Sequence, residues 1–168
     1  MAIIGTAMAN KRKGMHCIVS SVEHSSVKEP FNFLEKEGFR ITYLPVDKDG
    51  IVDIEALKDA LDDETILVSV MYVNNEIGAV EPIEEIGHII KDYNPDIVYH
   101  VDAIQAYANI RYILRSLELT CYQSAGIRFT DLREADSYSL MIRQESSLLY
   151  TAGDSRRACV QELKMFRL

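Results

Sequence analysis

Hydrophobic and polar positions form alternating blocks through the first two-thirds of the chain. Apolar runs rich in β-branched residues, bounded by polar or turn residues, predict strands at 16–20, 39–46, 65–73 and 97–101. Apolar residues at helical spacing predict helices at 2–10, 26–37, 53–61 and 83–93. We therefore expect helices and strands to alternate along residues 2–101.

Local signals support several of these boundaries. Asp53 is placed to cap the third helix, and Pro82 stands at the start of the fourth. Pro30 limits how early the second helix can begin, because proline lacks the backbone N–H of a helix interior.

This alternation predicts an α/β fold with a mainly parallel sheet flanked by helices, since strands that alternate with helices join through right-handed crossovers. Beyond Ile110 the pattern weakens. Residues 112–120 fit either a helix or a strand, and residues 131–143 have no convincing period. We expect an irregular C-terminal tail.

Composition narrows the class of protein. The 168 residues are 48% hydrophobic and carry a net charge of −8, which fits a globular chain and disfavours nucleic acid as a partner. No apolar run approaches the roughly 20 residues that span a bilayer, and no basic leader precedes the first apolar stretch. We expect a cytoplasmic protein with no membrane partner.

The three cysteines, Cys17, Cys121 and Cys159, are odd in number and widely spaced. That spacing suits neither a disulfide framework nor a zinc site and fits a reducing compartment. Cys17 lies in a predicted strand and is expected to be a small core residue.

The charge pattern changes near residue 110. Residues 1–110 hold 9 basic and 19 acidic residues, and 7 of those basic residues are lysine. Residues 111–168 hold 9 basic and 7 acidic residues, and 8 of those basic residues are arginine. All four prolines precede residue 110. The two parts therefore differ in kind.

Polar residues gather where three predicted strands end, which is where ligands bind in parallel sheets. The candidates are His24, Asn75, Asp102 and Gln105. A buried carboxylate at Asp102 would favour a bound cation, and the flat ring of His24 could stack on an aromatic ligand. Each has an ordinary alternative: Asp102 could cap a helix, His24 could lie on the surface, and the two amides could bridge loops.

The remaining histidines give no metal site. His100 lies inside a predicted strand and is expected to be a satisfied core residue, while His88 lies in a predicted helix. Their spacing is not that of metal ligands, and the sequence has no common glycine-rich phosphate loop.

Four motifs occur together in order: SSVEH at 20–24, TILVSVM at 65–71, VNNEIG at 73–78 and YHVDAIQ at 99–105. In order and spacing they resemble the cysteine desulfurases, pyridoxal-phosphate enzymes of the class V aminotransferase family. The resemblance covers about residues 2–110. It implies that residues 1–110 are the central part of the large domain of a fold type I pyridoxal-phosphate transferase.

The resemblance also implies roles for the four candidates. His24 would stack on the pyridine ring, and Asp102 would pair with the protonated ring nitrogen. Asn75 and Gln105 would contact the phenolic oxygen or nearby polar groups. No metal is implied.

Family motifs outside these residues are missing. Upstream the family has a Gly-Ala-Thr segment that holds the phosphate, and downstream a Ser-Gly-His-Lys segment with the Schiff-base lysine and a loop with the persulfide cysteine. Family spacing places the lysine near Arg128, and an arginine cannot form that bond. Neither Cys121 nor Cys159 stands in a matching motif. We assign no catalytic residue, and covalent cofactor attachment is not expected.

A frame change would explain the second part. Suppose that each new codon takes the third base of one residue's codon and the first two bases of the next codon. Residues 124–128 can then read Ser-Gly-His-Lys, and in the same shifted frame residues 114–134 and 151–166 can be read to resemble further downstream motifs of the family. We hypothesise that residues 111–168 are an out-of-frame translation. The alternative is a genuine, divergent C-terminal domain.

The family reaction removes sulfur from L-cysteine, giving alanine and an enzyme persulfide for iron–sulfur cluster assembly or thiolation. Family members are homodimers that pass sulfur to scaffold proteins. This chain is expected to be inactive alone. The alternatives are a non-catalytic fragment that pairs with an intact subunit, and a fragment of a related class V transferase such as a selenocysteine lyase.

Overall fold

A computed structural model describes residues 2–106 with their side chains, and the backbone of three later strands at 121–127, 135–142 and 148–152. Helices and strands alternate through the first part, as the sequence predicts. They are α1 (Ala2–Asn10), β1 (His16–Ser20), α2 (Ser25–Lys36), β2 (Arg40–Leu44), α3 (Ile54–Ala60), β3 (Thr65–Met71), α4 (Ile83–Tyr93) and β4 (Val98–Asp102).

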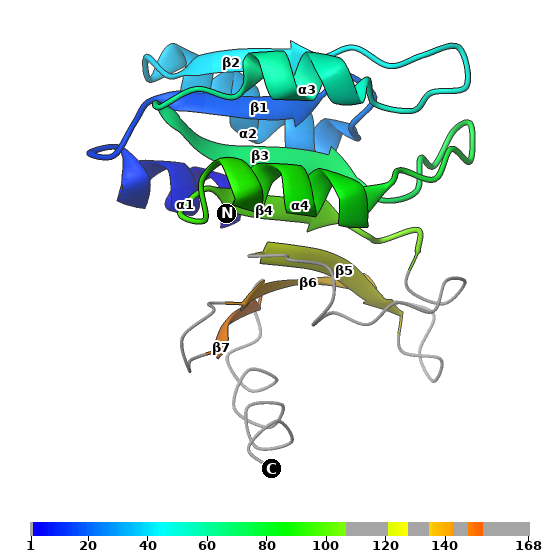
Figure 1. The fold of residues 1–168 in the computed structure, drawn as a ribbon. Coiled ribbons are helices and arrows are strands. Elements are labelled where there is room, and N and C mark those ends of the chain that lie inside the picture. The colour runs from blue at the N-terminus through cyan, green and yellow to red at the C-terminus, as the bar shows by residue number, and fades with distance from the viewer. Residues whose placement is uncertain (1, 107–120, 128–134, 143–147, 153–168) are drawn as a thin grey trace.

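The strands form one sheet in the order β2-β1-β3-β4-β5-β6-β7. The pairs from β2 to β5 are parallel, which confirms the predicted parallel sheet. Because β1, β3 and β4 are neighbours and parallel, the loops that follow them meet at one edge of the sheet (Figure 1).

Helices cover both faces of this parallel part. Figure 1 shows α3 and α4 in front of the strands and α1 and α2 behind them. Each face has its own apolar core, and β3 is buried along its whole length because both layers cover it. Alternate residues of a strand point to opposite faces, so Ile18 packs under α3 and α4 while Cys17 and Val19 pack under α1 and α2.

Two helix starts show how the local sequence sets the boundaries. Asp53 caps α3, accepting hydrogen bonds from the backbone N–H groups of Glu55 at 2.9 Å and Ala56 at 3.2 Å, as predicted. Helix α2 begins at Ser25 and runs through Pro30, so the proline does not delay its start. His24 occupies the N-cap position, and its side chain accepts a hydrogen bond from the backbone N–H of Ser26 in the first turn.

Three strands that the sequence does not predict lie in the tail: β5 (Cys121–Ile127), β6 (Ala135–Ile142) and β7 (Leu148–Ala152). Strand β5 pairs with β4 in parallel, and β6 and β7 continue the sheet in antiparallel pairs. The candidate helix or strand at 112–120 lies outside the described residues.

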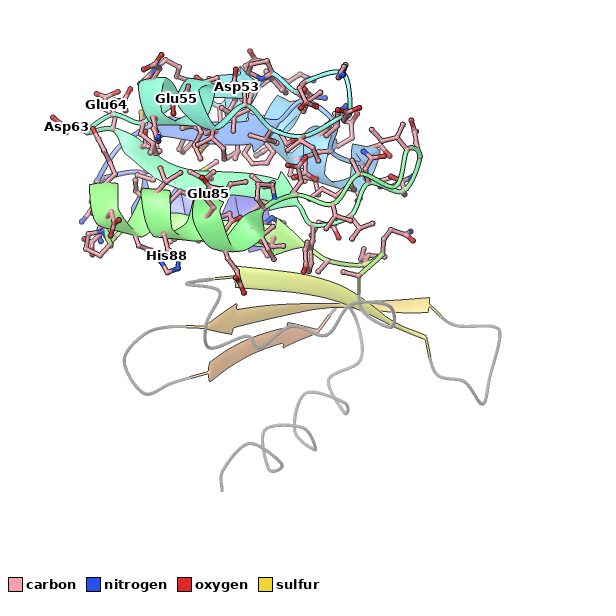
Figure 2. All side chains as sticks on the ribbon, turned by 45° about the vertical axis from the view of Figure 1, so that its right-hand side comes forward. Asp53, Glu55, Asp63, Glu64, Glu85 and His88 are labelled. Atoms are coloured by element: carbon pink, nitrogen blue, oxygen red, sulfur yellow. The ribbon has the colours of Figure 1, made fainter. Side chains whose placement is uncertain are left out.

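The outer surface of α3 and α4 is charged. Figure 2 places Glu55 on α3 and both Glu85 and His88 on α4, and His88 is exposed. Asp63 and Glu64 lie at the end of the sheet where β3 begins, opposite the edge at which the candidate residues gather. Within the described part of the chain, no helix has the length and apolarity needed to cross a bilayer.

Candidate functional site

The loops after β1, β3 and β4 bring the predicted polar clusters together at one edge of the sheet. Asn74, in the loop after β3, is buried, and its side-chain N–H donates to the carbonyl of Val22 in the loop after β1 at 3.0 Å. Its Oδ1 accepts from the backbone N–H groups of Glu76 at 2.8 Å and Ile77 at 3.0 Å. Asn74 therefore joins two loops and shapes one of them.

Asp102 is the last residue of β4, so this strand ends one residue later than its predicted end at 101. Its side chain is 3% exposed, and Oδ1 accepts a hydrogen bond from the backbone N–H of Ile104 at 3.1 Å. Burial raises the pKa of the Asp102 carboxyl, while that hydrogen bond and the nearby charge of His24 oppose the rise. The capping bond uses one carboxylate oxygen, so capping a turn and facing a cation are compatible.

His24 is exposed at the N-cap of α2. Its Nδ1 accepts from the backbone N–H of Ser26 at 3.2 Å and lies 2.9 Å from Ser26 Oγ. Accepting this N–H through Nδ1 fixes the orientation of the ring at the start of α2. Electrostatic interaction with His24 lowers the pKa of the Asp102 carboxyl, against the effect of burial.

Asn75 and Gln105 are both exposed, one in each of the other two loops. The structure places all four candidates in or next to the loops at the same sheet edge, and the charge of His24 acts on the Asp102 carboxyl. Asn74, rather than Asn75, ties the loops together, and sequence reasoning did not assign that role.

Glu23 is a further residue that sequence reasoning did not assign. It lies in the loop after β1, directly before His24, yet it is only 3% exposed. Burial, together with the nearby negative charges of Asp102 and Glu81, raises the pKa of Glu23 to about 8. The only signal in the sequence was an acidic residue inside the SSVEH segment.

Ser69 and His100 lie side by side beneath these loops, in register on β3 and β4. Ser69 Oγ is 2.8 Å from His100 Nδ1, and both residues are buried. This confirms that His100 is a hydrogen-bonded core histidine. Cys17 is fully buried in β1, which confirms it as a core residue.

The residues present fit a flat heterocycle with a positively charged nitrogen. A desolvated carboxylate at Asp102 favours a cation, and the exposed ring of His24 at the same sheet edge offers an aromatic face. Glu23 adds a second buried acid whose Oε2 has no hydrogen-bond partner among the described residues. No cluster in that part of the chain has the three histidine, cysteine or acidic side chains that a metal ion needs.

Comparison with known proteins gives one family. The family model for class V aminotransferases matches residues 1–125. A cysteine desulfurase IscS from Clostridium botulinum strain Hall is 47% identical over 128 residues, covering 76% of this chain and 32% of the relative. One from Dictyoglomus turgidum is 56% identical over 110 residues, covering 66% of this chain and 27% of the relative.

Solved structures agree. A NifS-like protein aligns with a TM-score of 0.77 at 32% identity, covering 85% of this chain and 39% of that one. A structure of SspA in complex with cysteine aligns with a TM-score of 0.68 at 32% identity, covering 73% of this chain and 35% of that one. The chain spans about a third of the length of the curated relatives that it matches.

Proposed function

Because this chain belongs to the class V aminotransferase family, a family that implies dependence on pyridoxal phosphate, we propose that its described residues form the floor for the cofactor ring in a cysteine desulfurase. Relatives named cysteine desulfurase, 47% and 56% identical, support this choice. The observation that carries the proposal is the buried Asp102 carboxylate at the end of β4, at the same sheet edge as the loop that carries His24.

Pyridoxal phosphate, when bound, supplies an electron sink for bond breaking at the amino-acid substrate. Asp102 would hold a proton on the ring nitrogen, because a desolvated carboxylate favours a cationic partner. His24 would stack on the ring in the orientation that its cap bond to Ser26 fixes. Asn75 and Gln105, exposed at the same edge, would donate to the phenolic oxygen or nearby polar groups.

The proposed reaction of the whole enzyme takes the sulfur of L-cysteine, leaves alanine and places the sulfur on an enzyme cysteine as a persulfide. The persulfide would then serve iron–sulfur cluster assembly or thiolation. Cys17 is unsuited to carry it. The thiol is completely buried, and burial raises its pKa to about 12, whereas the attacking species must be an accessible thiolate.

The 168-residue chain alone is proposed to be catalytically incomplete, since its sequence has no lysine in the family's Schiff-base motif. Residues 1–110 are proposed to be the desulfurase part and residues 111–168 an out-of-frame translation. The arginine-rich composition of the tail and its readable second frame support this. Sequencing the coding DNA tests it: one inserted base at codons 110–112 should restore a long desulfurase frame, and failure to do so refutes it.

Cofactor titration of the full chain tests the site. The absorbance change of pyridoxal phosphate would be followed for the unmodified chain, for Asp102→Asn and for Asp92→Asn, whose target is an exposed carboxylate on α4. We expect Asp102→Asn to weaken binding at least ~10-fold, which corresponds to about 1.4 kcal/mol, while Asp92→Asn binds as the unmodified chain does. Equal affinities for all three proteins would refute the proposed site.

A further inference from the structure

Glu23 is a buried acid that the proposed function leaves without a role. It lies at the carboxyl end of β1, 3% exposed, directly before His24. Its Oε2 is buried and has no hydrogen-bond partner among the described residues, which is unusual for an ionised carboxylate. A carboxyl group in such surroundings is stable only when its charge is neutralised or compensated.

A short polar path leads from Glu23 across the sheet toward Asp102. Ser69 Oγ, on β3, is 3.4 Å from Glu23 Oε1 and 2.8 Å from His100 Nδ1 on β4. Asp102 follows His100 by two residues, so both side chains lie on the same face of β4. The single hydroxyl hydrogen of Ser69 must serve either Glu23 or His100, so the protonation of Glu23 decides the direction of both bonds.

The charges around Glu23 decide where a shared proton lies. Asp102 and Glu81 repel a negative charge on Glu23, and they outweigh the attraction of Lys28 on α2. Asp102 receives a backbone hydrogen bond from Ile104 and interacts electrostatically with His24, and both favour its anionic form. Two buried carboxyl groups that repel each other ionise one at a time, so the proton belongs to Glu23 and the negative charge to Asp102.

We propose that Glu23 is a positioning residue for the Asp102 carboxylate: as a neutral acid beneath the site, linked through Ser69 to His100, it leaves Asp102 as the one anion offered to the ring nitrogen. The role at the ring rests on the proposed function, whereas the coupling between the two carboxyl groups belongs to the protein without cofactor. Above neutrality Glu23 ionises and adds a second negative charge beside Asp102, which would hold the ring proton to higher pH.

The coupling is tested first without cofactor, by carbon-13 NMR of the side-chain carboxyl groups of the full chain over a range of pH. One glutamate signal should titrate near pH 8, disappear in Glu23→Gln and persist in Glu29→Gln, which alters an exposed acid on α2. In Asp102→Asn that signal should titrate at lower pH, because a repelling charge is gone, and Asp92→Asn should not move it. If a variant fails to fold, the unmodified chain still tests the inference, because its spectrum must contain one glutamate signal that titrates above neutrality.

Absence of any glutamate titration above neutrality, or a titration that ignores Asp102→Asn, would overturn the inference. A glutamate with only a structural role would show no change in its titration when Asp102 is replaced. The cofactor titration separates this inference from the proposed function. If Asp102→Asn fails to weaken binding while the two carboxyl groups remain coupled, only the proposed function fails. If Asp102→Asn weakens binding and the coupling is absent, only the role of Glu23 fails.

Discussion

Replacing Gly14 with alanine should destabilise the edge of the sheet where β1 and β3 begin, opposite the edge that carries the site loops. Gly14 lies just before β1, and an added Cβ would collide with the backbone carbonyl oxygen of Glu64, approaching its carbonyl carbon at 2.7 Å and its Cα at 2.8 Å. These atoms belong to the backbone that enters β3, so no side-chain rotation can relieve the contact. The N–H of His16 also donates to that same carbonyl at 3.0 Å.

The cost follows from these contacts. Forcing one extra carbon against rigid atoms costs about 1–3 kcal/mol, and losing the His16 to Glu64 hydrogen bond adds about 1 kcal/mol. Alanine also reduces the conformational entropy of the unfolded chain, which stabilises the folded state by about 0.4–1 kcal/mol and offsets part of this cost. We therefore expect Gly14→Ala to lower the free energy of unfolding by about 1–4 kcal/mol.

Gly5→Ala is the matched control. Gly5 lies within α1, and nothing lies within 4 Å of the added Cβ, so alanine should stabilise the helix by up to about 1 kcal/mol. Urea unfolding followed by circular dichroism measures both variants. If Gly14→Ala is as stable as the unmodified chain, or if both variants change stability equally, the close approach of β1 to the start of β3 is not as described.

Two further predictions concern residues around the sheet. Burial opposes ionisation of Asp62, but hydrogen bonds from Arg40 and Thr65 outweigh it and lower the pKa to about 2. The ionised Asp62 carboxylate therefore stabilises the fold above the pKa of the unfolded chain, 3.8, and this stabilisation is lost as pH falls through 2. Stability should therefore fall less steeply with acid in Asp62→Asn than in the control Asp63→Asn. Identical acid unfolding curves for the two variants would contradict this. Asn74→Ala should lose about 2–3 kcal/mol in urea unfolding, since it removes three hydrogen bonds, whereas Asn75→Ala should not; equal losses would contradict the assigned role of Asn74.

The parallel sheet was predictable because its signals are local. The uniformly apolar run at 65–71 predicts a doubly covered strand, and the position of Asp53 before a helical pattern predicts its cap. Strand order follows from neither signal. The prediction that the polar clusters meet came from the general behaviour of parallel sheets, and the adjacency of β1, β3 and β4 places the loops that carry them at one edge.

Other features depend on contacts that no local pattern contains. Glu23 is buried because Ser69, 46 positions later, lies beneath it. Asn74 has its role through Val22, 52 positions earlier. Helix α2 begins at Ser25, one residue before the predicted start, and the side chain of His24 caps it by accepting from the backbone N–H of Ser26. The strands at 135–142 and 148–152 escaped prediction because their sequences have no clear period.

The central claim concerns one ion pair, and nitrogen-15 NMR of labelled pyridoxal phosphate bound to the full chain measures it most directly. We predict a ring nitrogen that stays protonated at a mildly alkaline pH at which the free cofactor has lost that proton, and that loses it in Asp102→Asn. A bound ring nitrogen that titrates like the free cofactor in both proteins would contradict the account.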